Sequence, residues 1–225
     1  MKQSHSSAQQ RAIKIIRMLR GSTKGMPETA STLIIDRYGK DPYLILISCI
    51  LSLRTKDTTS YPASVRLFEK AKTPQAMLTL SPETIEKLIY PTGFYRNKAK
   101  VILTISKDLL DRFDGMVPKS EDDLLSLHGV GIKTANLVRG EAFDIPAICV
   151  DTHVHKISNR LGLVKTETPE QTEKALKELL PKQYWTEFGR LLVMWGQNMC
   201  VPISPFCSKC AIADICPRIG VSRSR

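Results

Sequence analysis

Helix-starting dipeptides recur along this chain and constrain its fold more than any other feature. Four times, a side chain that favours a helix N-cap is followed by a proline, which suits the first helical position: Asp41-Pro42, Thr73-Pro74, Ser81-Pro82 and Thr168-Pro169. Ser120-x-x-Asp123 resembles a capping box, and Thr168-x-x-Gln171 matches one. Between these starts apolar residues follow helical spacing, and no strand-length stretch alternates polar and apolar residues. We therefore predict an all-α protein of about ten short helices.

The composition is that of a folded protein. With 225 residues, 42% of them hydrophobic, the chain can build a real core in one large domain or two small ones, which excludes a disordered chain. The N-terminus MKQSHSSAQQ is polar, and the longest apolar run, Tyr43 to Leu53, is too short to span a bilayer. We expect a soluble, cytoplasmic protein without a targeting signal.

The formal net charge of +11 is concentrated at the two ends of the chain. Residues 1–40 carry eight Lys or Arg and two acidic residues, and residues 200–225 carry four and one. If the two ends fold together, one module would carry the electrostatic attraction to a phosphate backbone. Solvated tails are the alternative for part of this charge, and we expect Lys2, Arg223 and Arg225 to be disordered.

The stretch LHGVGIKTANLVRG, residues 127–140, places two glycines around one valine between two helical patterns. We predict that a helix over 121–127 ends there, that the glycines allow a tight turn with positive φ, and that a new helix begins near Ile132. Such a turn aims free backbone N–H groups outward, where they suit a DNA phosphate. The pattern is typical of a helix-hairpin-helix, although Gly-x-Gly alone also fits an ordinary turn between helices.

Two side chains near this turn are candidates for chemistry. Lys133 stands in the first turn of the second helix, where the helix dipole disfavours a positive charge, and a neutral amine can attack a carbon atom. Asp151 follows an apolar run and precedes a helical pattern over 152–162. An aspartate there is also a natural N-cap, with a contribution of about 1 kcal/mol. A solvated lysine and a simple helix cap are the alternative interpretations.

The segments LSLRTKD, GFYRNKAK, LHGVGIKTAN and VDTHVHKISNRLG, with the C-terminal cysteines, resemble the endonuclease III-like DNA glycosylases of the helix-hairpin-helix superfamily. The resemblance extends from roughly Ile34 to Cys216. It implies two helical domains with a DNA-binding cleft between them. A six-helix barrel over 35–145 would contain the hairpin at 121–142, and residues 11–34 and 146–218 would form an iron–sulfur domain. Residues 1–10 would be a disordered tail.

The resemblance also implies an activity, the excision of oxidised pyrimidines from double-stranded DNA and cleavage at abasic sites in base excision repair. Lys133 corresponds to the nucleophile, which attacks C1′ of a flipped nucleotide, forms a Schiff base and nicks the strand by β-elimination. Asp151 corresponds to the essential carboxylate, which helps to deprotonate the amine and stabilises positive charge on the sugar. Related adenine glycosylases lack this lysine, so Lys133 indicates a bifunctional enzyme. His128 replaces the family's usual proline, and a softer or pH-sensitive hairpin is the expected consequence.

Four of the six cysteines lie in a proline-rich stretch with the pattern C-x6-C-x2-C-x5-C: Cys200, Cys207, Cys210 and Cys216. Disulfides are rare in cytosolic proteins, so metal binding is the better interpretation. Structural zinc usually takes two close pairs, often with histidine, whereas thiolates spread in this way can each hold one iron of a cubane. The spacing favours a cluster over zinc or unligated thiols, and the resemblance implies a [4Fe-4S] cluster. Cys49 and Cys149 are expected to be buried packing residues.

DNA contacts are expected from several segments. The resemblance joins the N-terminal helix to the cluster domain, so the basic residues of both ends should form one DNA-facing surface: Arg11, Lys14, Arg17, Arg20, Lys209 and Arg218. The hairpin and the segment after Asp151 add five expected contacts: Gly129, Val130, Gly131, Thr134 and His153. Arg54 stands where the family commonly has a glutamine that fills the space left by the flipped nucleotide. We hypothesise that Arg54 is this wedge and favours lesions opposite guanine, and a phosphate contact is the alternative.

Two other functions are compatible with parts of this sequence. A non-catalytic DNA-binding module would use the hairpin for phosphate and the cysteines for folding, and covalent trapping of Lys133 on abasic DNA would distinguish it from the enzyme. A ferredoxin-like electron carrier is disfavoured because the cluster motif lies beside DNA-binding features. We expect a monomer that binds damaged DNA and no membrane.

Overall fold

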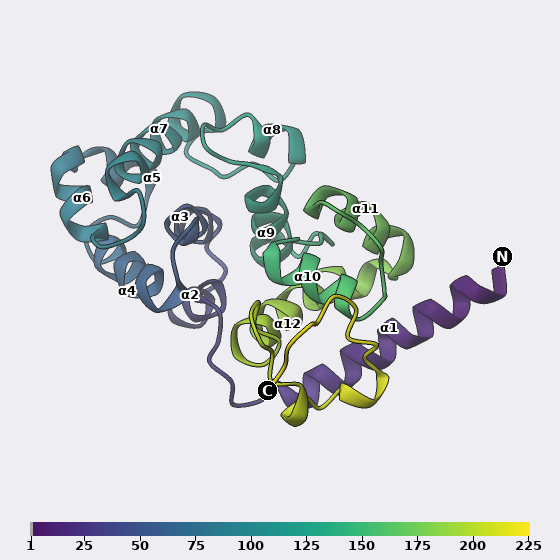
Figure 1. Ribbon diagram of the computed structural model, residues 1–225. Helices are drawn as coiled ribbons and strands as arrows, with labels where there is room; N and C mark the ends of the chain where they lie inside the picture. The colour runs from purple at the N-terminus through teal and green to yellow at the C-terminus, as the bar shows by residue number, and fades with distance from the viewer. Residues whose placement is uncertain (1) are drawn as a thin grey trace. The chain divides into compact units, whose positions relative to one another are not determined.

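The computed structural model describes residues 2–225, with side chains described from residue 7 onward. Every regular element in this range is a helix and none is a strand, which confirms the all-α prediction. The described range contains twelve α-helices rather than about ten (Figure 1). Two of them, α5 (Pro74–Leu78) and α8 (Glu121–Leu125), are only five residues long. No helix in this range is both long and apolar enough to cross a membrane.

The helix starts use the capping side chains that the sequence predicts. Four side chains accept a hydrogen bond of 3.0 to 3.3 Å from the backbone N–H three residues on, and a proline follows each: Asp41, Thr73, Ser81 and Thr168. Ser120 Oγ accepts from Asp123 N over 3.1 Å and also bonds to Asp123 Oδ2 over 2.6 Å. Each cap satisfies an N–H group that the helix start would leave without a partner.

The chain divides into two compact units. One comprises residues 29–145, and the other joins the residues up to 28 to residues 146–225. The chain first passes from the terminal unit to the 29–145 unit after Glu28, before α2 (Ala30–Tyr38). We expected this boundary after residue 34. The reason is packing, because α2 contacts α3 and α4 of the 29–145 unit.

The 29–145 unit is built around one apolar helix, α3 (Pro42–Ser52), which buries every residue from Tyr43 to Leu51. A helix that is hydrophobic on all sides needs neighbours all around it. Helices α2, α4, α7 and α9 contact α3, and Figure 1 shows α3 inside the ring of this unit's helices. The remaining bounds in this unit are α4 (Asp57–Phe68), α6 (Pro82–Ile89), α7 (Tyr95–Phe113) and α9 (Ile132–Phe143).

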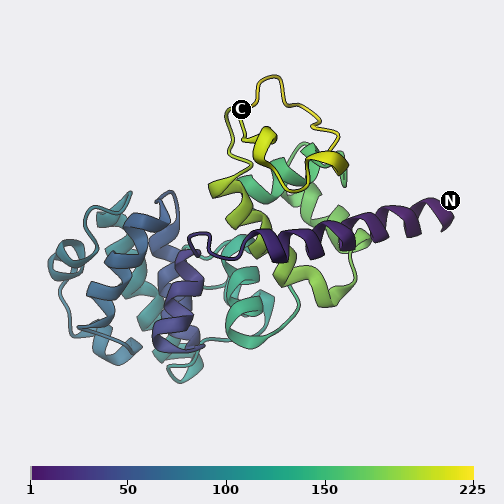
Figure 2. The same cartoon turned by 90° about the horizontal axis from the view of Figure 1, so that it is seen from below.

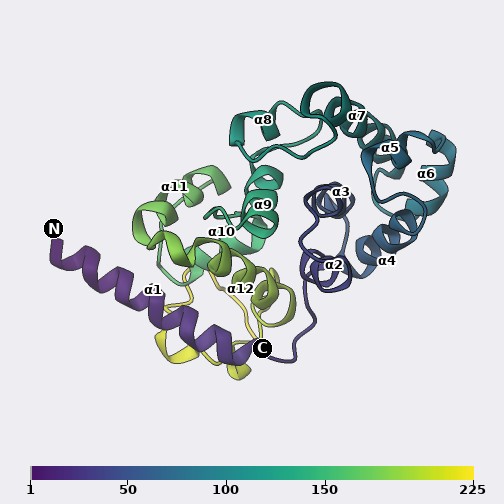
Figure 3. The same cartoon turned by 180° about the vertical axis from the view of Figure 1, so that it is seen from behind.

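The terminal unit has a separate apolar core. Its helices are α1 (Lys2–Ser22), α10 (Thr152–Arg160), α11 (Pro169–Leu179) and α12 (Trp185–Asn198), with short 3-10 turns η1 (Lys182–Tyr184), η2 (Cys207–Lys209) and η3 (Ala213–Ile215). Ile16 and Leu19 of α1 share this core with Phe188 and Trp195 of α12. Figure 3 shows α1 alongside α12, and Figure 2 shows the C-terminal segment, in yellow, as the loops that follow α12.

Both ends of the described chain are more structured than we predicted. Helix α1 begins at Lys2, so residues 2–10 are helical rather than a disordered tail, and Gln9 Nε2 donates to Leu179 O over 3.2 Å. The backbone N–H of Arg225 donates to Pro205 O over 2.8 Å. The Arg225 guanidinium lies 4.0 Å from the centre of the Phe206 ring. These tertiary contacts fix the two terminal segments in place, although the composition of each segment alone predicts a solvated tail.

Candidate functional site

The hairpin between α8 and α9 is anchored by apolar side chains and closed by a glycine. Leu127 and Val130 are buried, and Val130 N donates to Leu127 O over 3.1 Å. Gly129 has a φ of +79°, and a Cβ at this position would lie 2.8 Å from Cγ1 of Val101. Position 129 therefore requires glycine for two reasons, the left-handed backbone conformation and the close approach of α7.

The outer side of the hairpin presents backbone rather than side chains. His128, Gly129 and Gly131 are exposed. Gly131 is the N-cap of α9, so no side chain caps this helix start, and a Cβ at Gly131 would meet nothing within 4 Å. The N–H groups of the first turn of α9 thus offer a site for an anion such as a phosphate.

Two of the residues predicted to contact DNA have buried side chains. Val130 is 7% exposed and Thr134 is 4% exposed. Val130 belongs to the apolar anchor of the hairpin, and Thr134 is one of the buried residues of α9. Only the backbone groups of these two residues are left to meet DNA.

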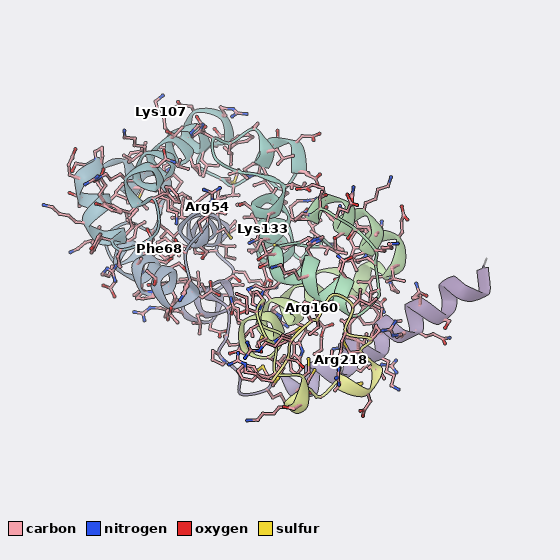
Figure 4. The ribbon with its side chains drawn as sticks, viewed as in Figure 1. Arg54, Phe68, Lys107, Lys133, Arg160 and Arg218 are labelled. Atoms are coloured by element: carbon pink, nitrogen blue, oxygen red, sulfur yellow. The ribbon has the colours of Figure 1, made fainter. Side chains whose placement is uncertain are left out.

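Lys133 lies in the first turn of α9 and is exposed. The three residues that follow it, Thr134, Ala135 and Asn136, are buried and fix the helix on the core. Figure 4 shows the position of Lys133 on α9. The result is an exposed primary amine in the first turn of a helix that packs on the core, directly after a turn suited to phosphate.

Asp151 begins α10 in the terminal unit. Its Oδ1 accepts hydrogen bonds from the N–H groups of His153 and Val154, over 2.8 and 2.9 Å, which confirms the predicted N-cap. Both bonds end on the same oxygen, and within the described range no donor bonds to Oδ2. One carboxylate oxygen therefore holds the start of α10 while the other remains available for chemistry.

His153 packs its ring against α12 within the terminal unit. A Cβ at Gly196 would overlap the His153 ring, so a glycine at that place on α12 makes room for it. His153 is partly buried as a result. A contact between His153 and DNA stays a prediction.

Arg54 lies in a strained turn that follows α3. It is exposed, it has a φ of +50°, and its guanidinium carbon lies 5.5 Å from the centre of the Phe94 ring. Phe94 has a φ of +57° and is 64% exposed. Left-handed backbone at a residue other than glycine costs on the order of 1–3 kcal/mol, so the surrounding structure must hold both residues. An arginine stacked on an exposed aromatic ring suits contact with DNA bases.

Lys98 of α7 is the main support of this turn. It is 5% exposed, and its Nζ donates to Leu51 O, Leu53 O and Thr55 Oγ1 over 2.6, 2.7 and 2.8 Å. No ion pair of Lys98 occurs among the described residues. A buried cation is thus held by three oxygen acceptors, one in the last turn of α3 and two on the connection that carries Arg54.

Gly93 supports the same turn from the α6–α7 connection. Its N–H donates to Thr55 Oγ1 over 3.0 Å, and a Cβ at Gly93 would lie 2.7 Å from Arg54 O. The only local indication that Phe94 has a functional role is that GFYRNKAK places an aromatic residue in a turn between helices. Nothing in the sequence indicated the role of Lys98, whose partners are 43 to 47 residues away.

One pocket in the terminal unit is lined by all four cysteines of the C-terminal pattern: Cys200, Cys207, Cys210 and Cys216. All four are partly buried and free of disulfides. No three His, Cys, Asp or Glu side chains in the described range converge closely enough for one metal ion. Cys49 is buried, as predicted, whereas Cys149 is only partly buried.

Arg160 brings a buried positive charge to this pocket (Figure 4). Its guanidinium donates to Cys200 Sγ over 3.3 Å and to the carbonyls of Val201 and Pro202 over 3.0 and 2.7 Å. Burial raises the pKa of the Cys200 and Cys210 thiols, although Arg160 opposes this at Cys200. Metal ligation replaces the proton of such thiols, and the nearby cation balances thiolate charge.

Trp195 places a hydrogen-bond donor without an acceptor beside these cysteines. The residue is 1% exposed and lines the same pocket, and its Nε1 has no hydrogen-bond partner in the described range. A buried donor without an acceptor costs about 1–3 kcal/mol. The sulfur atoms of an iron–sulfur cluster would supply acceptors, so the donors and thiols of this pocket fit such a group.

Two basic residues expected to face DNA are used inside their own unit. Arg11 donates to two backbone carbonyls, one directly after α10 and one in η3. Arg20 forms an ion pair with Glu187 of α12, with one hydrogen bond of 2.7 Å. These contacts hold α1 in place, whereas Lys14 and Arg17 are exposed and remain candidates for DNA contacts.

Comparisons with known proteins identify the family of this chain. The profile of the HhH-GPD superfamily of base excision DNA repair proteins matches residues 47–182. Endonuclease III of Thermotoga maritima is 48% identical over 176 residues, which cover 78% of this chain and 83% of that protein. A non-covalent endonuclease III–DNA complex has a similar fold, with a TM-score of 0.83, 32% identity, and 93% and 95% of the two chains covered. A trapped covalent endonuclease III–DNA intermediate has a TM-score of 0.77 at 32% identity and covers 92% and 96%.

The chain belongs to the HhH-GPD superfamily of base excision DNA repair proteins. Within it, the similarity is to endonuclease III, so the resemblance indicated by the sequence motifs is confirmed.

Proposed function

We propose that this protein is a bifunctional DNA N-glycosylase and abasic-site lyase of the endonuclease III type, which excises oxidised pyrimidines in base excision repair. The observation that carries this proposal is the amine of Lys133, exposed on a rigid helix directly after the glycine hairpin. A trapped covalent complex of the relative with DNA supports a mechanism through a covalent intermediate. The alternative of a non-catalytic DNA-binding module is not favoured.

Lys133 acts as the nucleophile on C1′ of the damaged nucleotide. The lone pair of its neutral amine forms the new bond, and the bond between C1′ and the base breaks, with its electron pair leaving on the base. The bound nitrogen then loses a proton, and its lone pair forms the double bond of a protonated imine as the C1′–O4′ bond breaks and O4′ takes up a proton. Loss of a proton from C2′ then expels the 3′ phosphate, which cuts the strand, and water releases the amine.

Asp151 contributes its second carboxylate oxygen. Oδ1 is committed to the cap of α10, so we assign to Oδ2 the transfer of protons during the reaction and the stabilisation of positive charge that develops on the sugar. This division lets one side chain hold the helix and take part in the reaction.

DNA binding uses backbone at the hairpin and side chains at the Arg54 turn. The exposed backbone of Gly129 and Gly131 and the uncapped first turn of α9 bind a phosphate without reading sequence. Arg54 and Phe94 enter the base stack where the damaged nucleotide is extruded, and Arg54 donates to the base that has lost its partner.

The four cysteines of the C-terminal pattern would hold a [4Fe-4S] cluster. When bound, the cluster links the loops after α12 through four thiolate bonds and stabilises the terminal unit. Arg160 compensates the negative charge of these thiolates.

A panel of duplexes with different base lesions, scored separately for base release and strand cleavage, tests this function. We expect both events on oxidised pyrimidines, and borohydride should trap a covalent complex. Base release without trapping would contradict the lyase assignment, and DNA binding without either event would favour the non-catalytic alternative.

A further inference from the structure

We propose that Lys98 is a positioning residue for DNA recognition, whose ammonium group clamps the turn that presents Arg54 to the base opposite the lesion. The inference rests on the proposed function, because it concerns how that same site reads DNA. Lys98 itself is buried and would touch neither the DNA nor the reacting atoms.

The clamp requires a protonated amine. Lys98 Nζ meets three oxygen acceptors within 2.8 Å, two of which are carbonyls that cannot donate a hydrogen bond. The third, Thr55 Oγ1, donates to Leu53 O over 3.2 Å. An ammonium group has three N–H donors for three acceptors, whereas a neutral amine has two donors and a lone pair. Loss of the proton would therefore break one bond and place a lone pair against an oxygen atom.

The clamp acts on both neighbours of Arg54. Leu53 O and Thr55 Oγ1 lie on either side of it in the chain, and Gly93 packs against its carbonyl. These three supports hold Arg54 at a φ of +50°, a conformation that an arginine does not favour by itself. Without them, we expect the turn to relax to negative φ and to redirect the arginine and its stack on Phe94.

Among the described residues, no carboxylate forms an ion pair with Lys98. The elements next to it carry these titratable or charged side chains: Tyr43 and Cys49 on α3, Arg54 and Lys56 on the connection, Asp57 on α4, Glu83, Glu86 and Lys87 on α6, Tyr90 on the following turn, and Tyr95, Arg96 and Lys100 on α7. None of them forms an ion pair with Lys98, and Glu86 pairs with Arg96. Burial lowers the pKa of Lys98 to about 8.

Because of this lowered pKa, an effect of Lys98 deprotonation on DNA recognition can be distinguished from an effect on the stability of the fold. The ordinary value is 10.5, so between about pH 8 and 10.5 the unfolded chain binds more protons at this residue than the folded protein. Titration of Lys98 in that range therefore contributes increasing, not decreasing, stability to the fold. Deprotonation of Lys98 therefore does not itself destabilise the fold, and thermal unfolding at the same pH shows whether the protein remains folded.

The wild-type protein allows a first test without a substitution. Cleavage of a lesion duplex requires extrusion of a base and occupation of the resulting space, whereas cleavage of single-stranded abasic DNA requires neither. Lys133 acts on both substrates, so the ratio of the two rates reports on the steps that only the duplex requires. We expect this ratio to fall as the pH rises through about 8, while thermal unfolding shows no loss of stability attributable to Lys98.

Lys98→Met tests the clamp directly, and Lys100→Met on the exposed face of the same helix is the matched control. Misplacement of a recognition side chain by about 1 Å costs up to a hundredfold, so we expect Lys98→Met to lower the duplex-to-single-strand ratio by about tenfold or more. The ratio should then no longer depend on pH near 8. Lys100→Met should leave both the ratio and its pH profile unchanged.

If Lys98→Met does not fold, Thr55→Val and Thr55→Ser form a second pair. Valine removes an acceptor of Lys98 and of Gly93 N–H, whereas serine keeps the hydroxyl. We expect a lower ratio for the valine variant only. Parallel loss on both substrates, or a pH-independent ratio in the wild type, would overturn the proposal. A wild-type protein that cleaves neither substrate would instead refute the proposed function.

Discussion

Replacement of Asp151 by asparagine should separate its role as the N-cap of α10 from the catalytic role that we propose for it. Asparagine and aspartate are about equally good N-caps, so the amide oxygen can still accept from His153 N and Val154 N. The side chain nevertheless loses its negative charge and can no longer take a proton. We expect an unchanged fold with little turnover.

The expected loss of stability follows from the two cap hydrogen bonds of Asp151, and the expected loss of rate follows from its carboxylate. Loss of an N-cap in Asp151→Ala should lower the free energy of unfolding by about 1 kcal/mol, or roughly 2–4 °C in Tm for a chain of this length. Loss of a general acid–base group typically lowers the rate by about 10²–10⁴-fold. Asp151→Asn should therefore show only the second effect, and Asp151→Ala both.

Thermal unfolding and single-turnover base release on one lesion duplex measure these effects. Thr168→Ala is the matched control, because Thr168 caps α11 in the same unit and has no role in the reaction. It should lose stability by a similar amount and keep its turnover. Near-native turnover in Asp151→Asn would show that the cap is the whole role of this residue and would refute the assignment.

Three further predictions address the nucleophile, the hairpin and the cysteine pocket. Lys133→Gln should abolish borohydride trapping on abasic DNA while binding survives in a gel-shift assay, because an amide cannot form an imine; residual trapping would point to another amine. Gly129→Ala should cost about 1–3 kcal/mol in a denaturant melt, from its positive φ and the contact with α7, and Gly131→Ala much less, so equal losses would contradict the hairpin geometry. The purified protein should be yellow-brown, and Cys207→Ser should bleach and destabilise it, whereas a colourless anaerobic preparation with stoichiometric zinc would exclude the cluster.

Much of the fold could be predicted from the sequence because helix starts are local. The cap of Asp41 involves a backbone N–H only three residues away, and the proline that follows carries its preference in its own ring. The hairpin is local in the same sense, since the positive φ of Gly129 and the start of α9 depend on a few adjacent residues. Sequence motifs were therefore sufficient for the helical class, the family, and the candidates Lys133 and Asp151.

Tertiary structure alone decided which side chains are available to a ligand. The charge count could not show that Arg20 is paired with Glu187, 167 residues away, or that the Val130 side chain is buried. The support of Arg54 depends on Lys98, which reaches backbone carbonyls more than 40 residues earlier in the chain. Local sequence determines backbone conformation because its interactions span a single turn, whereas burial and long-range hydrogen bonds exist only after distant segments have packed together.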